Sequence, residues 1–239
     1  IQPRPKSENP VACWTFGSEC DGAFAHYTVT ASEEAYSLQS DLSDEELASF
    51  PCAYSTAENM LQRARVGRND RVFITGASGG VGSAAVQLAG RRGARVIASC
   101  SPSKAEQVRA LGATEVVDRG ANPVAVLGRD SVDVVLDLVV GKQWPNLLDI
   151  LRPGGKYATA GAIAGPIVEF DVRTLYLKDL TFYGCTSQDP QVFGNLISYI
   201  ERGEIKPLLS KVYPLSEIVA AQTDFLAKKF TGKLVLTIP

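Results

Sequence analysis

Glycines between residues 75 and 85 form the strongest chemical signal in the sequence. The segment reads TGASGGVGSAA and lies between a short apolar run and an amphipathic stretch. Glycine allows a tight turn, and it lets the backbone approach a pyrophosphate at the positive end of the following helix. The spacing is G-x-x-G-x-x-G, whereas a G-x-G-x-x-G pattern would need glycine in place of Ala77. Because the glycines lie between a predicted strand and a predicted helix, we predict that this segment binds a dinucleotide. The alternative is a glycine-rich turn that binds nothing. Its contacts are expected from Gly76, Ser78, Gly79, Gly80, Val81 and Gly82.

The end of the next predicted strand indicates which dinucleotide binds. In NAD sites an Asp or Glu at this position takes the ribose hydroxyls, but residues 99–104 read SCSPSK and contain no acid. A carboxylate would repel a 2′-phosphate, whereas hydroxyls and a lysine would bind one. The segment therefore favours NADP(H), with Ser101 and Lys104 as phosphate ligands and Ser99 and Ser103 beside them. The alternative, that Ser-Pro-Ser-Lys only caps the next helix, is compatible with this role.

Alternating strands and helices must position these residues. Strands are predicted at 71–75, 95–99, 115–118, 132–140, 156–160 and 180–184, with helices through 92 and at 103–111, 144–151 and 190–202. Residues 132–140 (VDVVLDLVV) are typical of a strand buried on both faces of a parallel sheet. The alternation indicates an α/β fold with a doubly wound parallel sheet of the Rossmann type. The aromatic residues expected in its core are Trp144, Tyr157, Phe182 and Tyr183.

The two ends of the chain do not follow this alternation. Residues 1–21 show no period and are predicted to be loop, and residues 22–31 alternate apolar with polar side chains and predict a strand. Ser43 with Glu46 predicts a capping box at the start of a short helix. Further elements are predicted as a helix at 53–64, a strand at 211–213, a helix at 216–228 and a closing strand at 232–238.

Composition argues against several classes of protein. The 24 basic and 26 acidic side chains give a net charge of −2, so no broad attraction to nucleic acid or anionic membrane is expected. No apolar run reaches the roughly 20 residues of a membrane-spanning helix, and the first residues lack the apolar core of a secretory signal. The five scattered cysteines fit neither a disulfide framework nor a zinc knuckle, and they are most compatible with a reducing cytoplasm.

Six motifs together resemble the medium-chain dehydrogenase/reductase superfamily, which includes zinc alcohol dehydrogenases and quinone reductases. They are GAFAHYTV at 22–29, FPCAYSTA at 50–57, TGASGGVGSAAVQLA at 75–89, RALGATEVVD at 109–118, LRPGGKYATAG at 151–161 and TGKLVL at 231–236. The resemblance covers nearly the whole chain, and it implies that most of the family's GroES-like catalytic domain has no counterpart here. It divides the chain into a remnant of that β-rich domain at 1–47, a Rossmann NADP-binding domain at 48–203 and a closing segment at 204–239.

The resemblance also implies roles for single positions. Thr56 is similar to the threonine that packs on the nicotinamide face, and Leu138 and Val139 follow the fourth strand close to the nicotinamide ribose. Cys52 lies where the zinc enzymes place their third catalytic ligand, which makes it a catalytic candidate beside Thr56. Backbone groups that usually hold the nicotinamide carboxamide correspond to Gly161, Ala162, Gly184, Cys185 and Thr186.

A catalytic zinc ion needs three protein ligands and an open position for substrate. In the family the other two ligands come from the region without a counterpart here, and the substitutes present are few: Cys13, Glu19, Cys20 and His26. We therefore expect the chain as given to bind well under one zinc ion, with Cys52 a ligand only in an intact enzyme. The alternative is that Cys52 is a buried, inert thiol. For His26 we expect a half-exposed position on a strand.

The resemblance implies an NADP(H)-dependent oxidoreductase that transfers hydride between nicotinamide and a carbonyl, an alcohol or an activated alkene. The substrate would be a small molecule, with no nucleic-acid or membrane partner. The alternative is a non-catalytic NADPH-binding module, or a truncated fragment without turnover, because the catalytic domain is incomplete. Residues 180–184 (LTFYG) read as an apolar edge strand, and since this edge commonly pairs with its two-fold mate in the family, a homodimer is expected.

Overall fold

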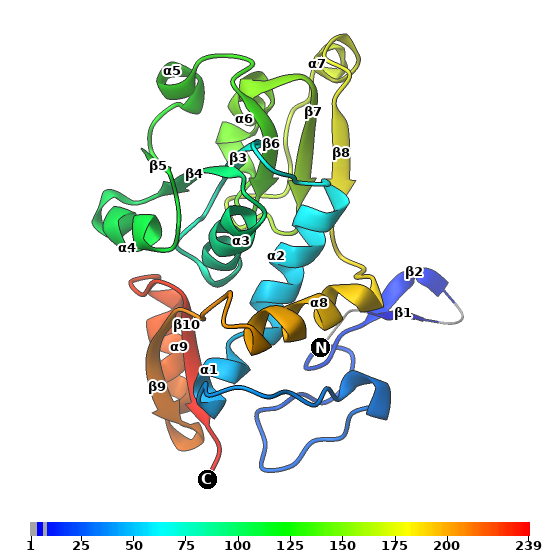
Figure 1. Ribbon diagram of the computed structural model, residues 1–239, viewed down its shortest axis with the longest axis vertical. Coiled ribbons are helices and arrows are strands. Elements are labelled where there is room, and N and C mark those ends of the chain that lie inside the picture. Colours follow the sequence, from blue (N-terminus) through cyan, green and yellow to red (C-terminus); the bar gives the residue numbers. More distant parts are fainter. Residues whose placement is uncertain (1–3, 7–8) are drawn as a thin grey trace. The chain divides into compact units, whose positions relative to one another are not determined.

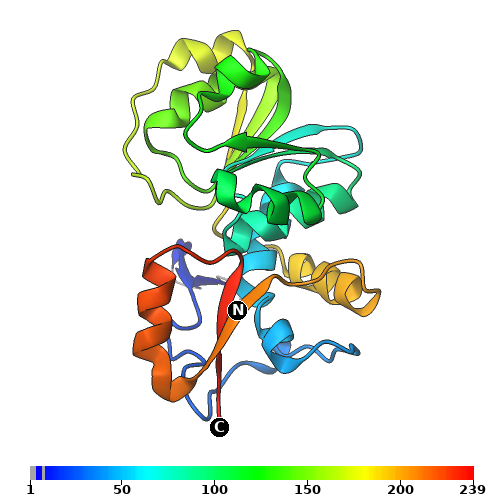
Figure 2. The same cartoon turned by 90° about the vertical axis from the view of Figure 1, so that its left-hand side faces the viewer.

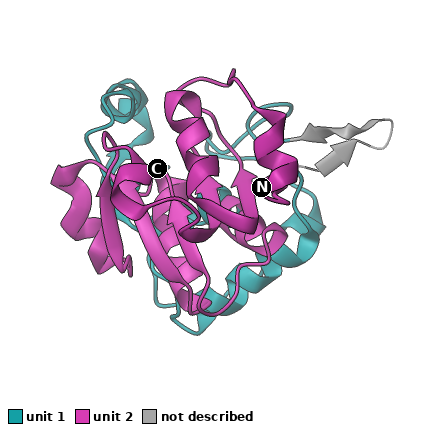
Figure 3. Ribbon diagram, turned by 90° about the horizontal axis from the view of Figure 1, so that it is seen from above, with its two compact units in different colours: residues 1–55, 186–239 teal, residues 56–185 magenta. Residues whose placement is uncertain are grey.

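The computed structural model describes residues 4–6 and 9–239, with side chains from Thr15 onward. Contacts divide the chain into two compact units (Figure 3). Residues 1–55 and 186–239 form one, here called the flanking unit, and residues 56–185 form the other, called the sheet unit. The division lies at 55/56 and 185/186, whereas the boundaries expected from sequence are 47/48 and 203/204.

The sheet unit is built on six parallel strands (Figure 1). They are β3 (Arg71–Ile74), β4 (Arg95–Cys100), β5 (Glu115–Asp118), β6 (Val132–Asp137), β7 (Leu151–Thr159) and β8 (Thr181–Gly184). Their order is β5-β4-β3-β6-β7-β8, and each neighbouring pair is parallel. This is the doubly wound Rossmann order, so the predicted fold class is confirmed. The order reverses between β3 and β6, and ligands of such sheets bind beyond the carboxyl ends of the strands at that point.

Helices cover both faces of this sheet (Figure 2). They are α3 (Gly80–Arg91), α4 (Ala105–Ala110), α5 (Pro123–Leu127), α6 (Trp144–Ile150) and α7 (Val172–Leu177), with 3-10 turns η2 (Pro102–Lys104) and η3 (Gly141–Gln143). Trp144 and Leu148 of α6 belong to the buried cluster that contains Phe73 of β3. Val72 and Ile74 are also fully buried, and because successive strand residues point to opposite faces, they lie on the α3 side. Trp144 and Tyr157 are buried as expected, whereas Phe182 remains 36% exposed.

One strand of the sheet begins earlier than its sequence indicates. Pro153-Gly154-Gly155 is expected to separate a helix from a strand at 156–160, but β7 already starts at Leu151. Leu151 pairs with Val132, and the register then shifts before Lys156 pairs with Val134. The breaker residues are accommodated in this irregularity, because a bulge allows backbone conformations that a regular ladder does not.

The flanking unit has short elements from both ends of the chain. They are β1 (Arg4–Lys6), β2 (Asn9–Trp14), η1 (Ser32–Glu34), α1 (Asp44–Ala48), the first turn of α2 (Pro51–Arg63), α8 (Pro190–Glu201), β9 (Leu209–Pro214), η4 (Leu215–Glu217), α9 (Ile218–Leu226) and β10 (Lys233–Thr237). Strands β9 and β10 are parallel. Ser43 Oγ accepts from Glu46 N at 3.3 Å, and Glu46 Oε2 accepts from Ser43 N at 3.0 Å, so the predicted capping box is confirmed. Across the described residues, no helix combines the length and apolar character needed to cross a bilayer.

Two predictions for residues 1–31 are wrong. The described part of residues 1–21 is not all loop, because β1 and β2 form an antiparallel pair; both strands of a two-stranded sheet are edges, where proline is tolerated. Residues 22–31 form no strand, and Phe24, Tyr27 and Val29 are 68%, 93% and 92% exposed. An alternating pattern becomes a strand only with a partner for its ladder hydrogen bonds, and no described strand pairs with this segment.

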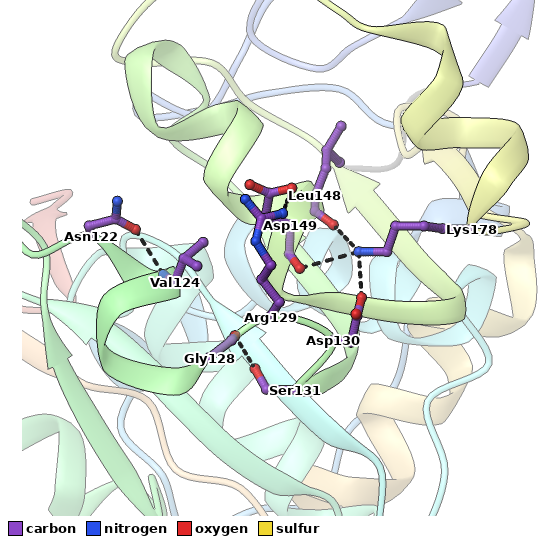
Figure 4. A network of polar contacts seen from close by, with 9 residues as sticks. All are labelled: Asn122, Val124, Gly128, Arg129, Asp130, Ser131, Leu148, Asp149 and Lys178. Carbon is purple, nitrogen blue, oxygen red and sulfur yellow. Dashed lines mark hydrogen bonds and ion pairs between the residues drawn. The ribbon is translucent and has the colours of Figure 1, made fainter.

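Lys178 ties the end of α6 to the segment between α7 and β8 (Figure 4). Its Nζ donates to Leu148 O at 2.9 Å and Asp149 O at 3.2 Å, and it lies 2.8 Å from Asp130 Oδ1. Arg129 Nη1 reaches Asp149 Oδ1 at 2.8 Å in the same network. The ammonium group therefore satisfies carbonyls at a helix C-terminus, where a positive charge is favourable.

Replacing Lys178 with alanine is expected to lower the free energy of unfolding by about 1–3 kcal/mol, because partly buried carbonyls lose a charged donor. Lys142→Ala is the matched control, since Lys142 is exposed and precedes the other end of α6. Urea unfolding followed by circular dichroism measures the difference. Equal midpoints for the two variants would show that the network contributes nothing to stability.

Candidate dinucleotide site

The glycine-rich turn connects β3 to α3 at the carboxyl edge of the sheet. Gly79 N donates to Gly76 O at 2.9 Å, and Ala77 N donates to Ser99 O at 3.0 Å, which attaches the turn to the end of β4. A Cβ added at Gly82 would lie 2.2 Å from Gly76 O and 2.7 Å from Ala77 Cα. Gly82 is therefore packed so closely against the turn that there is no room for a side chain.

The outer side of this turn is open at Gly79. Gly79 is exposed and begins α3 without a side-chain capping bond, and an added Cβ would meet only Gly76 O, at 3.4 Å. Its φ of −79° is accessible to every residue type. Packing within the chain thus requires glycine at 82 but not at 79. An open backbone at the positive end of the 12-residue α3 fits a pyrophosphate group. Around it, Ser78, Gly80 and Val81 are half-buried.

The segment after β4 carries the hydroxyls and the lysine expected for a 2′-phosphate. Ser101 Oγ and Ser103 Oγ lie 3.3 Å apart, and Lys104 is half-buried at the end of the same turn. Ser99 is buried, and its carbonyl oxygen holds the glycine-rich turn. Partial burial, and then the charge of Arg119, lower the pKa of Lys104 below its ordinary value.

Arg119 is a second cation at this edge that sequence reasoning misses. Strand β5 lies beside β4 with Asp118 opposite Cys100, and Arg119 N donates to Cys100 O at 2.9 Å. Arg119 therefore follows β5 at the position where Ser101 follows β4. The charge of Arg119 contributes to the lowered pKa of Lys104. The signal that could reveal it is the strand order of the fold, because residues that follow neighbouring parallel strands share one edge of the sheet.

Asp137 ends β6 as a fully buried side chain that no sequence pattern singles out. Its Oδ1 accepts hydrogen bonds from Thr75 Oγ1 at 2.6 Å, Val139 N at 2.9 Å and Val140 N at 3.0 Å. Its Oδ2 accepts one from Tyr157 Oη at 2.7 Å. Burial, and then the charge of Asp137, raise the pKa of Tyr157 well above its ordinary value, so the phenol stays protonated and donates.

The loops after β6 and β7 come together beside the glycine-rich turn. Ala164 N donates to Val139 O at 2.9 Å, and a Cβ added at Gly161 would lie 3.4 Å from Leu138 O. A Cβ added at Gly76 would lie 3.2 Å from Val139 Cγ2. Leu138, Val139 and Ala162, expected near the nicotinamide end, are half-buried on these loops.

The remaining residues expected near the nicotinamide lie after β8 and on α2. The Cys185 N–H donates to a carbonyl oxygen of β7 at 3.0 Å, and burial raises the pKa of its thiol. Arg63 Nη1 of α2 donates to Gly184 O at 3.0 Å, which attaches this helix to the end of β8. Thr56 is half-buried on the same helix, and Thr186 is exposed where the chain enters the flanking unit.

The described side chains do not fit a catalytic zinc ion. Cys52 is exposed on α2, so the alternative of a buried thiol is wrong. His26 is exposed in a segment without strand structure, so its expected strand position is also wrong, and the side chain of Cys13 lies outside the described residues. From Thr15 onward, no three His, Cys, Asp or Glu side chains lie close enough to share a metal ion.

Comparison with known proteins assigns the family. A family model described as zinc-binding dehydrogenase matches residues 80–202, about half of the chain. The quinone oxidoreductase of Mus musculus is 29% identical over 98% of this chain and 74% of its own.

Two solved structures agree with this assignment. A protein of Sinorhizobium meliloti 1021, provisionally named an alcohol dehydrogenase, is 47% identical with a TM-score of 0.91, and the match covers 97% of this chain and 65% of that one. The 2-octenoyl-CoA carboxylase reductase CinF, solved with NADP and 2-octenoyl-CoA, is 26% identical with a TM-score of 0.88, over 98% of this chain and 61% of that one. This chain thus spans less than two thirds of either protein. It belongs to the zinc-binding dehydrogenase family within the medium-chain dehydrogenase/reductase superfamily.

Proposed function

We propose that the chain is the cofactor-binding part of an NADP(H)-dependent oxidoreductase acting on a carbonyl, an alcohol or an activated alkene of a small molecule. The observation that carries the proposal is the backbone left open at Gly79, at the N-terminus of α3, where internal packing requires no glycine. The relatives' names, quinone oxidoreductase and alcohol dehydrogenase, support the reaction class.

The preference for NADP(H) is proposed from the carboxyl ends of β4 and β5. Ser101, Ser103 and Lys104 supply two hydroxyls and a cation after β4, and Arg119 adds a second cation after β5. The position that binds ribose hydroxyls in NAD sites carries no carboxylate. The NADP bound to CinF supports the same preference.

When bound, NADPH supplies a hydride, and the protein contributes orientation. In this proposal the glycine-rich turn holds the pyrophosphate through backbone N–H groups. The loops after β6 and β7 hold the nicotinamide ribose and carboxamide through Leu138, Val139, Gly161 and Ala162. Thr56 packs on the nicotinamide face, and backbone groups at Cys185 and Thr186 complete the carboxamide contacts.

Fluorescence titration with NADPH, followed by turnover with aldehydes, enones and quinones, tests this function. Binding with turnover of one substrate class supports the oxidoreductase. Binding without any turnover would favour the alternative, a non-catalytic NADPH-binding module. Absence of binding for both NADPH and NADH would contradict both functions.

We further propose that the chain forms a homodimer through the edge strand β8. This strand is last in the sheet order, and Thr181, Phe182 and Gly184 on it are exposed. An apolar strand edge exposed to solvent is prone to pairing with another strand.

We also propose a reducing, cytoplasmic location, supported by the thiols of Cys100 and Cys185, neither of which forms a disulfide.

Replacing Thr181 with lysine is expected to shift the protein from dimer to monomer, because a charge on an edge strand opposes pairing. Thr181 is a better probe than Phe182, because the Phe182 ring packs against other aromatic rings. Its centroid lies 5.4 Å from that of Tyr157 and 5.5 Å from that of Phe170. Glu115→Lys is the matched control, since Glu115 is exposed on β5 at the opposite edge. Light scattering at micromolar concentration measures the mass, and a monomeric wild-type protein would contradict the proposal.

A further inference from the structure

The turn at residues 138–140 is held from inside by two side chains, that of Thr75 just after β3 and that of Asp137 at the end of β6. The Leu138 N–H donates to Thr75 Oγ1 at 2.8 Å, while the Val139 and Val140 N–H groups donate to Asp137 Oδ1. Three consecutive backbone donors are therefore committed to the interior. A ligand outside this turn meets carbonyl oxygens and side chains, but no backbone N–H from these three residues.

The same turn contains a strained residue. Val140 is buried with φ +60° and ψ −138°, a conformation that is costly for a residue with a branched Cβ and easy for glycine. Such conformations persist only where surrounding contacts enforce them, and they are concentrated at functional sites. Here the enforcing contacts are the bonds to Asp137, together with the 2.9 Å bond from Ala164 N to Val139 O.

The turn touches both neighbouring parts of the candidate site. On one side Val139 packs against the glycine-rich turn at Gly76. On the other side Gly141 packs against Ala164 so closely that an added Cβ would lie 2.9 Å from the Ala164 side chain. A change in the path of residues 138–140 must therefore displace the loops on either side, because packed interiors have little free space.

We propose that Asp137 is a positioning residue. Hydrogen-bonded to Thr75 and Tyr157, it holds the strained turn 138–140 through the Val139 and Val140 N–H groups and thereby shapes the surface that receives the nicotinamide end of the cofactor. This inference rests on the proposed binding of NADP(H). If Asp137 acts in this way, its loss should weaken binding of the nicotinamide end selectively, and removing the strain should restore the NADPH affinity. A merely structural role would give neither result.

The test compares Asp137→Leu with Asp137→Asn in the full chain. Leucine removes every acceptor, so we expect NADPH to bind about tenfold more weakly, while 2′,5′-ADP, which lacks the nicotinamide end, binds within roughly threefold of wild type. Asparagine keeps an acceptor for the three Oδ1 partners, and its amide can donate to the Tyr157 hydroxyl, so it should retain most of the NADPH affinity.

Adding Val140→Gly to Asp137→Leu should recover most of the lost NADPH affinity, since glycine adopts this backbone conformation without strain. Hydrogen exchange of the peptide containing residues 138–140 should speed up in Asp137→Leu without any cofactor present. If Asp137→Leu does not fold, Thr75→Val removes one hydroxyl from the same network, and Thr75→Ser, which keeps it, is the control.

Two results would overturn the inference while leaving the proposed function intact. In the first, the wild-type protein binds NADPH, but Asp137→Leu loses as much affinity for 2′,5′-ADP as for NADPH. In the second, adding Val140→Gly to Asp137→Leu recovers none of the lost NADPH affinity. If the wild-type protein binds neither NADPH nor 2′,5′-ADP, the proposed function fails instead. In that case faster exchange at 138–140 would still show that Asp137 holds the turn.

Discussion

Replacing Gly79 with valine is expected to abolish NADPH binding while the protein remains folded. The valine side chain would project from the open side of the turn, where the pyrophosphate approaches the backbone, so we expect at least a roughly hundredfold rise in Kd. Within the chain the new Cβ meets only Gly76 O at 3.4 Å, and the backbone of Gly79 is already in an extended conformation. The cost in stability should be limited to that of a poor helix N-cap, about 0.5–2 kcal/mol.

Gly82→Ala provides the opposite control. Its Cβ would lie 2.2 Å from Gly76 O, so the turn or the helix must shift, and both stability and binding should fall. Thermal melting and fluorescence titration of the two variants separate a ligand contact from a packing requirement. If Gly79→Val melts as early as Gly82→Ala, glycine at 79 is required for packing and does not mark a pyrophosphate site.

Lys104→Ala and Arg119→Ala are each expected to weaken NADPH binding selectively. A charge-assisted contact with the 2′-phosphate contributes about 1.5–3 kcal/mol, which corresponds to roughly ten- to a hundredfold in affinity. NADH lacks this phosphate, so its Kd should hardly change. The two cations lie at the carboxyl ends of neighbouring strands, and the double variant should lose the preference for NADPH altogether.

Arg95→Ala is the matched control for this pair, because Arg95 is an exposed cation at the opposite end of β4. Titrations with NADPH and NADH at two salt concentrations measure the preference and separate a local contact from a general charge effect. Equal affinity of the wild-type protein for the two cofactors would contradict the assignment of this edge. A selective loss in Lys104→Ala alone would remove Arg119 from the site.

The glycine-rich turn shows which features can be predicted from the sequence and which require the structure. Periodicity and turn chemistry act over a few residues, so they correctly predict a strand, a glycine turn and a helix at this place in the chain. Glycine spacing does not show how much room surrounds each glycine. The packing of α3 on the turn does, because the distance from an added Cβ to Gly76 O is 3.4 Å at Gly79 and 2.2 Å at Gly82.

The strand predicted at 22–31 is wrong because a strand depends on contacts outside its own segment. Its alternating pattern is a local property, but a strand is stabilised by a partner and by burial of one face, and neither is present for Tyr27 or Val29 among the described residues. The predicted capping box succeeded because both of its hydrogen bonds join residues within one turn, Ser43 and Glu46.

The sequence by itself determined the doubly wound class of fold, the position of the glycine-rich turn and the lack of an acid after the second strand. The tertiary structure alone decided which distant residues share the site. Asp137 meets Thr75 across 62 positions and Tyr157 across 20, and Arg119 lies at the edge proposed to bind the 2′-phosphate only because β5 lies beside β4. Such contacts depend on strand order and register, which are set by the packing of the whole sheet and leave no periodic trace in the chain.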